Sequence, residues 1–265
     1  MKRLWQIGNI LALVFALVMN FLVAAQILNV PAINEISDKY ATALTPATYA
    51  FSIWSLIYVL LVVFVVYQAR DLLRQKAENV LPQMAGPLFI IASICNGLWT
   101  YVFVQDQTGL SVGILLLLTT SLYVLLWRLK IAMDNPPAKV IICVWWPLML
   151  YTGWVTVASV VNIASWLASV GVYVSAVAAN IVLVGLGLVL AVLLIKRNIR
   201  EVLVACIWGI VAIGVQQIQT PSAISTGMTA FIVAGVLLVF VAVHAYRNRH
   251  LNPFFTTMKS TQRSN

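Results

Sequence analysis

The chain has 265 residues, of which 62% are hydrophobic and only 9% are charged, and its formal net charge is +9. Soluble domains usually carry about 25% charged residues, so this chain has too few charges to cover the surface of a soluble protein. Lipid must therefore be the solvent for most of its side chains. We expect no nucleic-acid partner, because the positive charge is distributed as a membrane-topology signal.

Long apolar segments follow one another along the chain. Each has about 20 residues, the length that a helix needs to cross about 30 Å of hydrocarbon. The segments are apolar on every face, which favours helices over the alternating strands of a barrel. The sequence therefore predicts an all-α, polytopic membrane protein with about eight transmembrane helices, at 6–28, 47–69, 84–104, 109–127, 140–164, 172–195, 202–218 and 226–246.

The basic residues test this number of helices. Loops rich in Lys and Arg stay on the cytoplasmic side of a membrane. With eight helices, every one of the 16 basic residues except Lys39 falls on the same side. We therefore predict a multi-pass protein of the plasma or bacterial inner membrane with both termini in the cytoplasm. The residues on the cytoplasmic side are Lys2, Arg3, Arg70, Arg74, Lys76, Arg128, Lys130, Lys139, Lys196, Arg197, Arg200, Arg247, Arg249, Lys259 and Arg263.

The predicted helices contain no Asp, Glu, Lys or Arg. Ionisable residues inside a membrane usually mark proton relays or ion pathways, so an ion-coupled pump is disfavoured. No carboxylate pair, metal-ligand cluster or activated nucleophile stands out in the sequence. We therefore expect no catalytic residue, no metal and no required cofactor, and an enzymatic function ranks last among the hypotheses.

Three predicted helices carry aromatic and amide residues at helical spacing. Each set opens with the spacing i, i+3, i+7, which places its members on one helix face. The candidate ligand-binding residues are Phe51, Trp54 and Tyr58 in the second helix, Asn96, Trp99 and Phe103 in the third, and Tyr151, Trp154, Ala158 and Asn162 in the fifth.

The depth of the three tryptophans suggests that these faces converge. In the predicted topology Trp54, Trp99 and Trp154 all lie roughly 8–15 Å below the outer surface, deeper than interfacial anchors. Several indoles around one cavity would suit a large, flat, mostly apolar ligand. Asn96 and Asn162 must bond to protein or ligand, because an unpaired amide in hydrocarbon is costly. The competing interpretation is that these residues only pack the bundle, with the amides bonded across helices.

Short motifs within the same helices resemble those of a known family. The segment 45–58 is similar to the Pro-Pro…Phe-x-x-Trp-x-x-x-Tyr motif of the TspO/MBR family, the translocator proteins or tryptophan-rich sensory proteins, also called peripheral benzodiazepine receptors. The segments 96–103 and 151–162 resemble its Asn-x-x-Trp…Phe and Pro-Tyr-x-x-Trp…Ala…Asn motifs. Two positions depart from the pattern, because Thr45 replaces the first proline of the pair and Leu150 replaces the proline before Tyr151.

The resemblance covers roughly residues 1–167 and implies a fold for that part. It implies a TspO-like bundle of five helices at 1–168, with a cavity under the loop at 29–46. Three additional transmembrane helices and a short basic cytoplasmic tail would then occupy 169–265. In those helices Gln217 and Gln219 lie near an outer end, so we expect them to be exposed at the interface rather than to line a second site.

The resemblance also implies a function. Family members bind porphyrins such as protoporphyrin IX and haem, sterols and benzodiazepine-type drugs, and they often form dimers. We therefore expect a receptor or carrier that binds a flat hydrophobic ligand, with porphyrin or haem as ligand rather than cofactor and with a homodimer as one arrangement. One alternative is a small-metabolite transporter that uses all eight helices. The other is a membrane enzyme that acts on a tetrapyrrole or polyene.

Overall fold

A computed structural model of the protein describes residues 2–70, 72, 81–133 and 136–248. Every regular element within these residues is a helix, and eight helical segments are long and apolar enough to cross a membrane. The predicted all-α, polytopic fold class is therefore confirmed. Five of the basic residues used to predict the topology lie outside the described residues: Arg74, Lys76, Arg249, Lys259 and Arg263.

The helices follow the predicted segments with small differences at their ends. They are α1 (Lys2–Ala24), α2 (Ile33–Lys39), α3 (Ile53–Ala69), α4 (Leu81–Val104), α5 (Thr108–Arg128), α6 (Ala138–Val140), α7 (Trp146–Ser169), α8 (Ala176–Arg197), α9 (Arg200–Ile218) and α10 (Ile224–Arg247). Short turns of other helix types are η1 (Thr48–Ser52), η2 (Ile141–Trp145) and η3 (Pro221–Ala223).

Two of the helix ends have clear local causes. The first helix stops at Ala24 rather than near residue 28, and Gln26 and Asn29 then take left-handed backbone conformations with φ of 55° and 51°. Helix α8 begins at Ala176 rather than near residue 172, because the side chain of Ser175 accepts a hydrogen bond from the backbone N–H of Ala178. A serine in this position satisfies one of the free N–H groups of the first turn.

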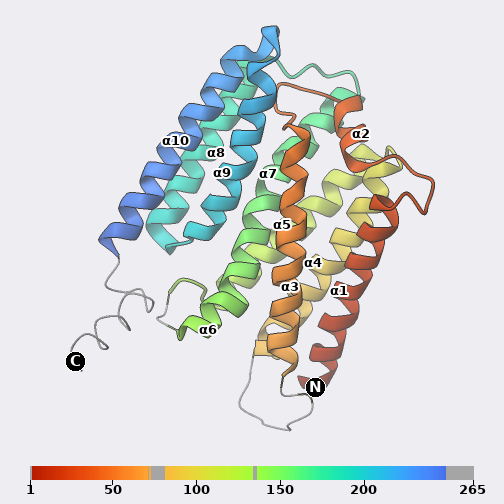
Figure 1. Ribbon diagram of the computed structural model, residues 1–265, viewed down its shortest axis with the longest axis vertical. Coiled ribbons are helices and arrows are strands. Elements are labelled where there is room, and N and C mark those ends of the chain that lie inside the picture. Colours follow the sequence, from red (N-terminus) through yellow and green to blue (C-terminus); the bar gives the residue numbers. More distant parts are fainter. Residues whose placement is uncertain (1, 71, 73–80, 134–135, 249–265) are drawn as a thin grey trace.

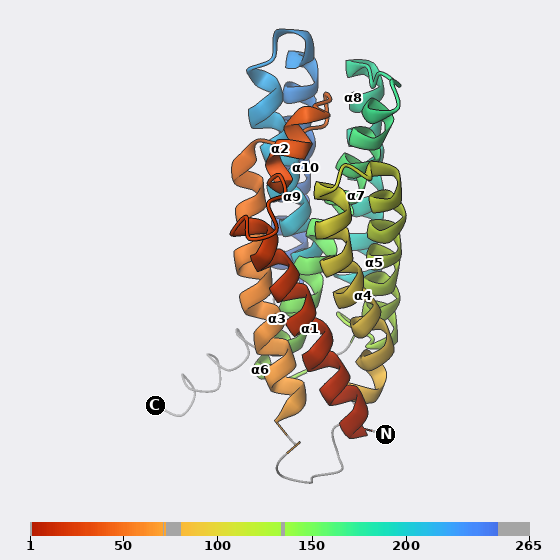
Figure 2. The same cartoon turned by 90° about the vertical axis from the view of Figure 1, so that its right-hand side faces the viewer.

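Five long helices form a closed ring. Helix α1 packs on α4, α4 on α5, α5 on α7, and α3 closes the ring by contacting both α7 and α1. Figures 1 and 2 show these helices side by side, with the short helix α2 across one end of the bundle. The sequence predicted no helix in the segment 29–46, so α2 is an addition to the expected fold.

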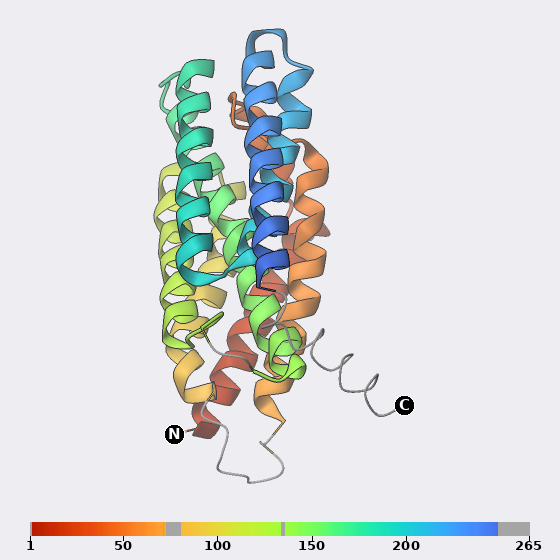
Figure 3. The same cartoon turned by 90° about the vertical axis from the view of Figure 1, so that its left-hand side faces the viewer.

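Helices α8, α9 and α10 form a second group beside this ring. Helix α9 lies against α7 on one side and α10 on the other, whereas α8 packs mainly on α10 (Figures 1 and 3). The contact between α7 and α9 is close, because a Cβ on Gly153 would lie 2.2 Å from the carbonyl oxygen of Val202. Small residues of this kind let helix backbones approach each other in membranes. The division into parts at residue 168 stays a prediction.

The two ends of the bundle differ in charge, as the predicted topology requires. Helix α1 begins and α10 ends toward the end opposite α2 (Figure 1). Arg70, Arg128, Lys139 and Arg197 lie in or next to the connections of that same end, whereas Lys39 lies on α2. The assignment of this basic end to the cytoplasm stays a prediction.

Helices α1 and α3 are joined firmly at only one end. Near the basic end, the side chain of the buried Gln68 accepts a hydrogen bond from Nδ2 of Asn9 at 3.2 Å and donates one to the carbonyl oxygen of Gln6 at 3.3 Å. The side chain of Gln6 in turn donates to the carbonyl oxygen of Gln68 at 2.8 Å. Toward the other end the two helices separate, and a groove of about 470 Å³ lies between them. This divergence leaves one side of the bundle open next to α2.

Candidate functional site

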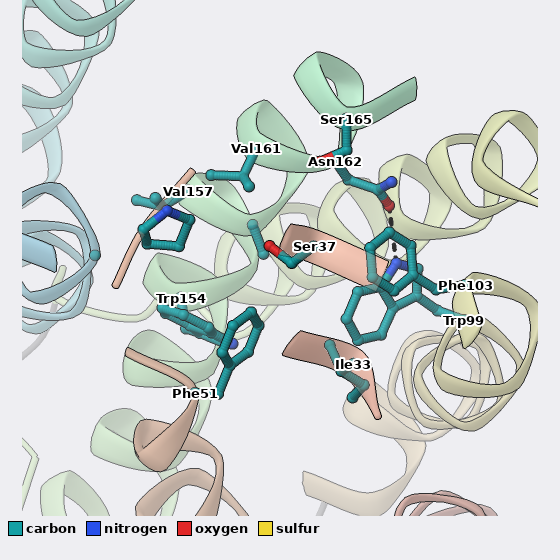
Figure 4. Close-up of a pocket in the computed structure, with 13 residues that line it drawn as sticks. Ile33, Ser37, Phe51, Trp99, Phe103, Trp154, Val157, Val161, Asn162 and Ser165 are labelled. Carbon is teal, nitrogen blue, oxygen red and sulfur yellow. Dashed lines mark hydrogen bonds between the residues drawn. The ribbon is translucent and has the colours of Figure 1, made fainter. Parts of the chain in front are cut away.

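A small cavity lies inside the ring, directly beneath the segment that contains α2. Its walls come from α4, α7 and α9, and Ile33, Ser37 and Pro46 cover it from the end of the bundle. Its volume is about 30 Å³, which is room for roughly one water molecule. Figure 4 shows Phe51 and Trp154 side by side at one edge, and Phe103 and Trp99 at the other. The cavity is therefore small and apolar, with aromatic rings at two of its edges.

Trp54 lies at the centre of an aromatic cluster next to this cavity. Its ring stacks on Tyr58 at a centroid distance of 5.2 Å, and lies 6.3 Å from Trp99. It also makes edge-on contacts with Tyr151 and Trp154 at 6.0 and 6.1 Å. Helices α3, α4 and α7 thus bring their aromatic faces together, as the i, i+3, i+7 spacing predicted.

Asn162 anchors one side of the cavity through a buried hydrogen-bond network. Its side-chain oxygen accepts a hydrogen bond of 2.8 Å from the indole Nε1 of Trp99, drawn as a dashed line in Figure 4. Its Nδ2 donates to the hydroxyl of Ser111 at 2.9 Å. The network ties α4, α5 and α7 together, so this amide is bonded within the protein and fixes the orientation of one indole.

Asn96 occupies a second buried network on the other side of the cluster. Its side-chain oxygen accepts hydrogen bonds from Nδ2 of Asn20 at 2.9 Å and from the hydroxyl of Tyr58 at 3.2 Å. Asn20 in turn accepts a bond from Thr100 at 2.9 Å. The network links α1, α3 and α4. It uses the side-chain oxygen of Asn96, whereas Nδ2 of Asn96 makes no hydrogen bond to any residue that the structure describes.

Several buried polar groups around the cluster have no hydrogen-bond partner among the described residues. They are Ser37 Oγ, Trp54 Nε1, Asn96 Nδ2, Tyr151 Oη and Trp154 Nε1. Each such group costs about 1–3 kcal/mol when it stays unpaired in a buried site. All five can donate a hydrogen bond, and the three nitrogen groups can only donate. The site therefore offers donors to whatever occupies it.

The groove between α1 and α3 adjoins the cavity. Phe51 and Ile33 line both spaces, so these two side chains form the wall between them. The groove side of this wall also includes Trp54 and Tyr58. If Phe51 and Ile33 moved aside, the two spaces would join into one of several hundred cubic ångströms, which is the usual size of a small-molecule site.

The structure divides the ten predicted site residues among three places. Six line the small cavity: Phe51, Trp99, Phe103, Trp154, Ala158 and Asn162. Trp54 and Tyr58 line the groove, together with Phe51. Asn96 and Tyr151 line neither space but belong to the buried cluster between them. That these ten residues bind a ligand stays a prediction.

Several residues of the cavity wall were missed from the sequence. Val161 and Ser165 continue the α7 stripe beyond Ala158 at helical spacing, so a longer reading of that stripe would have included them. Ile33 and Ser37 belong to the unforeseen helix α2, and Gly209 comes from α9. No spacing pattern in the sequence indicates a contribution from α9.

An ion pair lies at the C-terminal end of α2. The ammonium of Lys39 contacts the carboxylate of Asp106 in the connection between α4 and α5. Their hydrogen bond lowers the pKa of Asp106 and raises the pKa of Lys39. Both side chains are substantially exposed, so solvent screens the attraction and the pair contributes little stability.

Together, the fold and the site define a multi-pass helical membrane protein with a buried aromatic cavity, an arrangement suited to a receptor or transporter. The sequence matches the family described as TSPO-like protein over residues 6–243, so the chain belongs to that family. The match runs through α8, α9 and most of α10, well beyond the residues at 1–167 that carried the resemblance. No curated protein and no solved structure matches the chain.

Proposed function

We propose that this protein is a membrane receptor or carrier for a flat, mostly apolar ligand with hydrogen-bond acceptors, and that a tetrapyrrole such as protoporphyrin IX or haem is that ligand. One observation carries the proposal. Within the aromatic cluster, the indoles of Trp54 and Trp154 are 7% and 3% exposed, yet neither N–H makes a hydrogen bond. Flat aromatic walls favour a planar molecule, and unpaired donors favour carbonyl or carboxylate oxygens.

The ligand would occupy a widened form of the site. The cavity of about 30 Å³ is far too small for a tetrapyrrole, and pockets for drug-sized ligands measure roughly 300–1,000 Å³. Displacement of Phe51 and Ile33 would join the cavity to the groove of about 470 Å³. The ligand would then contact the ring of Trp54, and burial of the ligand's apolar surface would be the main source of affinity.

The proposal is tested by quenching of tryptophan fluorescence with protoporphyrin IX, in lipid nanodiscs with empty nanodiscs as the blank. Wild type is expected to show saturable quenching. Trp54→Phe/Trp154→Phe keeps apolar rings but removes both unpaired donors, so its Kd should rise by about tenfold, the equivalent of two weak hydrogen bonds.

A matched variant controls for the loss of two fluorophores. Trp127→Phe/Trp166→Phe removes two indoles that are 72% and 37% exposed and lie outside the cluster. Its Kd should equal that of wild type. Absence of saturable quenching in wild type would refute tetrapyrrole binding, and equal Kd values in the two double variants would refute the placement of the ligand.

A further inference from the structure

Helix α9 makes direct hydrogen bonds to the segment that leads from α2 into α3. The side chain of Gln217 donates through Nε2 to the carbonyl oxygens of Thr42 and Thr45, at 3.1 and 2.8 Å. The indole Nε1 of Trp208 donates to the carbonyl oxygen of Ala50 at 3.1 Å. Both side chains thus bond to backbone oxygens of the segment that covers the cavity.

Two further contacts lie between these anchors. The backbone N–H of Ala47 donates to the carbonyl oxygen of Ala212 at 3.0 Å. The ring of Tyr49 meets the ring of Trp208 edge-on, with centroids 5.3 Å apart. The segment 42–50 is therefore bonded to α9 at both of its ends and in its middle.

The burial of Gln217 shows that these bonds do not lie at the lipid interface. Its side chain is 3% exposed, which contradicts the expectation of simple interfacial exposure. The neighbouring Gln216 is exposed, and no hydrogen bond joins its side chain to the covering segment among the described contacts. Replacing this buried amide by an apolar side chain would remove a bond from each of the two carbonyl oxygens, and the oxygen of Thr42 would keep only its bond from the backbone N–H of Thr45.

The position of α9 is itself fixed by close packing on α7. A Cβ on Gly209 would lie 2.9 Å from a methyl group of Val157, and Cys206 Sγ lies 3.2 Å from the carbonyl oxygen of Gly153. Gly209 also lines the cavity. Because α7 carries Trp154, the same rigid pair of helices holds one wall of the site and its cover.

We infer that α9 holds the segment 42–50, the cover of the ligand site, in place and that Gln217 and Trp208 are positioning residues for it. The inference rests on the proposed function, because it gives these residues an effect on a ligand bound beneath the cover. The anchored segment contains Pro46 of the cavity wall and continues directly into Phe51 and Trp54. Loosening it would let the cover open more often, so a bound ligand would leave faster.

Two measurements on Gln217→Leu test the inference, with Gln216→Leu as the matched control. The first is hydrogen–deuterium exchange of the backbone amides at 42–50, in nanodiscs without ligand. The second is the dissociation rate of protoporphyrin IX by stopped-flow fluorescence. Gln217→Leu should raise both rates by about three- to tenfold, as expected for two hydrogen bonds inside a membrane protein. Gln216→Leu should change neither rate.

Trp208→Phe provides a second variant that does not depend on how Gln217→Leu folds. It keeps an aromatic ring next to Tyr49 but removes the bond to Ala50, so it should raise exchange at 49–52 by a smaller factor. Exchange of the α3 amides at 57–69 serves as the internal reference. A uniform rise in both regions, or no rise at 42–50, would overturn the inference.

The exchange measurement separates the failure of this inference from the failure of the proposed function. If wild type binds no porphyrin but Gln217→Leu still loosens 42–50 selectively, α9 anchors the cover and the ligand was chosen wrongly. If porphyrin binds but its dissociation rate is unchanged in a selectively loosened variant, the cover does not control release and the positioning role is overturned.

Discussion

The aromatic interior of the five-helix ring differs from the close glycine contacts between helices, which occur in the ring and also among α8, α9 and α10. In the ring, large aromatic side chains surround a small space and leave donors such as Trp54 Nε1 and Trp154 Nε1 unpaired. In the second group, glycines bring helices together. A Cβ on Gly214 would lie 2.8 Å from the ring of Phe231, and one on Gly227 would lie 2.7 Å from the backbone of Ile218.

The difference separates a region that can bind a ligand from a region that stabilises the fold around it. Unpaired polar groups are a cost to the folded protein unless something bonds to them. Close helix packing is the reverse, because dispersion contacts within it are already complete. We therefore expect substitutions of the unpaired donors to act mainly on ligand affinity, and substitutions at close helix contacts or at paired amides to act on stability.

The largest effect is expected where α9 packs on α7. Gly153→Val would place a branched side chain against the backbone oxygen of Val202, which lies 2.2 Å from the Cβ position. Forcing the helices apart should lower the free energy of unfolding by about 3 kcal/mol. The measurement is an SDS titration in mixed micelles followed by circular dichroism.

Gly185→Val controls for the helix propensity of valine. Gly185 lies within α8, and nothing occupies the space within 4 Å of its Cβ position. This variant should change the free energy of unfolding by less than about 1 kcal/mol. Equal losses in the two variants would contradict the claim that close packing of α9 stabilises the fold.

A smaller effect is expected in the network around Asn162. Asn162→Leu would leave Trp99 Nε1 without its acceptor and remove a bond to Ser111, at a cost of about 2 kcal/mol in the free energy of unfolding. The same titration measures it. Asn180→Leu is the control, because the side-chain oxygen of Asn180 has no hydrogen-bond partner in the part of the chain that the structure describes. Similar losses for both variants would show that the network is not a distinct source of stability.

The smallest effect concerns the ion pair of Lys39 with Asp106. The pair stabilises the folded state above the ordinary aspartate pKa of about 3.9 and below the ordinary lysine pKa of about 10.4. Its contribution is lost as pH falls through the lowered pKa of Asp106, or rises through the raised pKa of Lys39. The unfolding midpoint of wild type should exceed that of Asp106→Asn slightly at pH 7, and the two should converge toward pH 3.

Asp38→Asn is the control for the pH experiment, since Asp38 is an exposed carboxylate on the same helix α2 as Lys39. At pH 7 Asp38→Asn should lower the unfolding midpoint less than Asp106→Asn does, because it removes a negative charge from α2 but leaves the ion pair of Lys39 with Asp106 intact. A difference between wild type and Asp106→Asn that is as large at pH 3 as at pH 7 would show that the carboxylate charge does not stabilise the C-terminal end of α2.

The fold could be predicted from the sequence because its signals are local. Apolar length fixes each membrane helix, and helical spacing places Phe51, Trp54 and Tyr58 on one face. The cluster of Trp54, Trp99 and Trp154 followed from those faces and from a common depth. In the structure the ring centroids of Trp99 and Trp154 lie 6.3 and 6.1 Å from that of Trp54.

The cover and its support could not be predicted, because they depend on contacts between distant segments. Helix α2 has only seven residues and no side-chain cap, so neither its length nor its ends mark it in the sequence. Gln217 looks like an ordinary interfacial amide, since nothing near it in the sequence shows that backbone oxygens 172 and 175 residues away need its donors. The composition shows that the chain has such side-chain donors, but it does not show which backbone oxygens they bond.

The distance along the chain between Gln217 and Thr42 also has a consequence for biosynthesis. The covering segment leaves the ribosome early, directly after the first membrane helix, but its partner on α9 follows 175 residues later. Translation adds about 5–20 residues per second, so the segment 42–50 lacks its hydrogen bonds to α9 for roughly ten seconds or more after it is made. Every aromatic residue of the cluster is already made by then, so completion of the site is among the last events in the making of this protein.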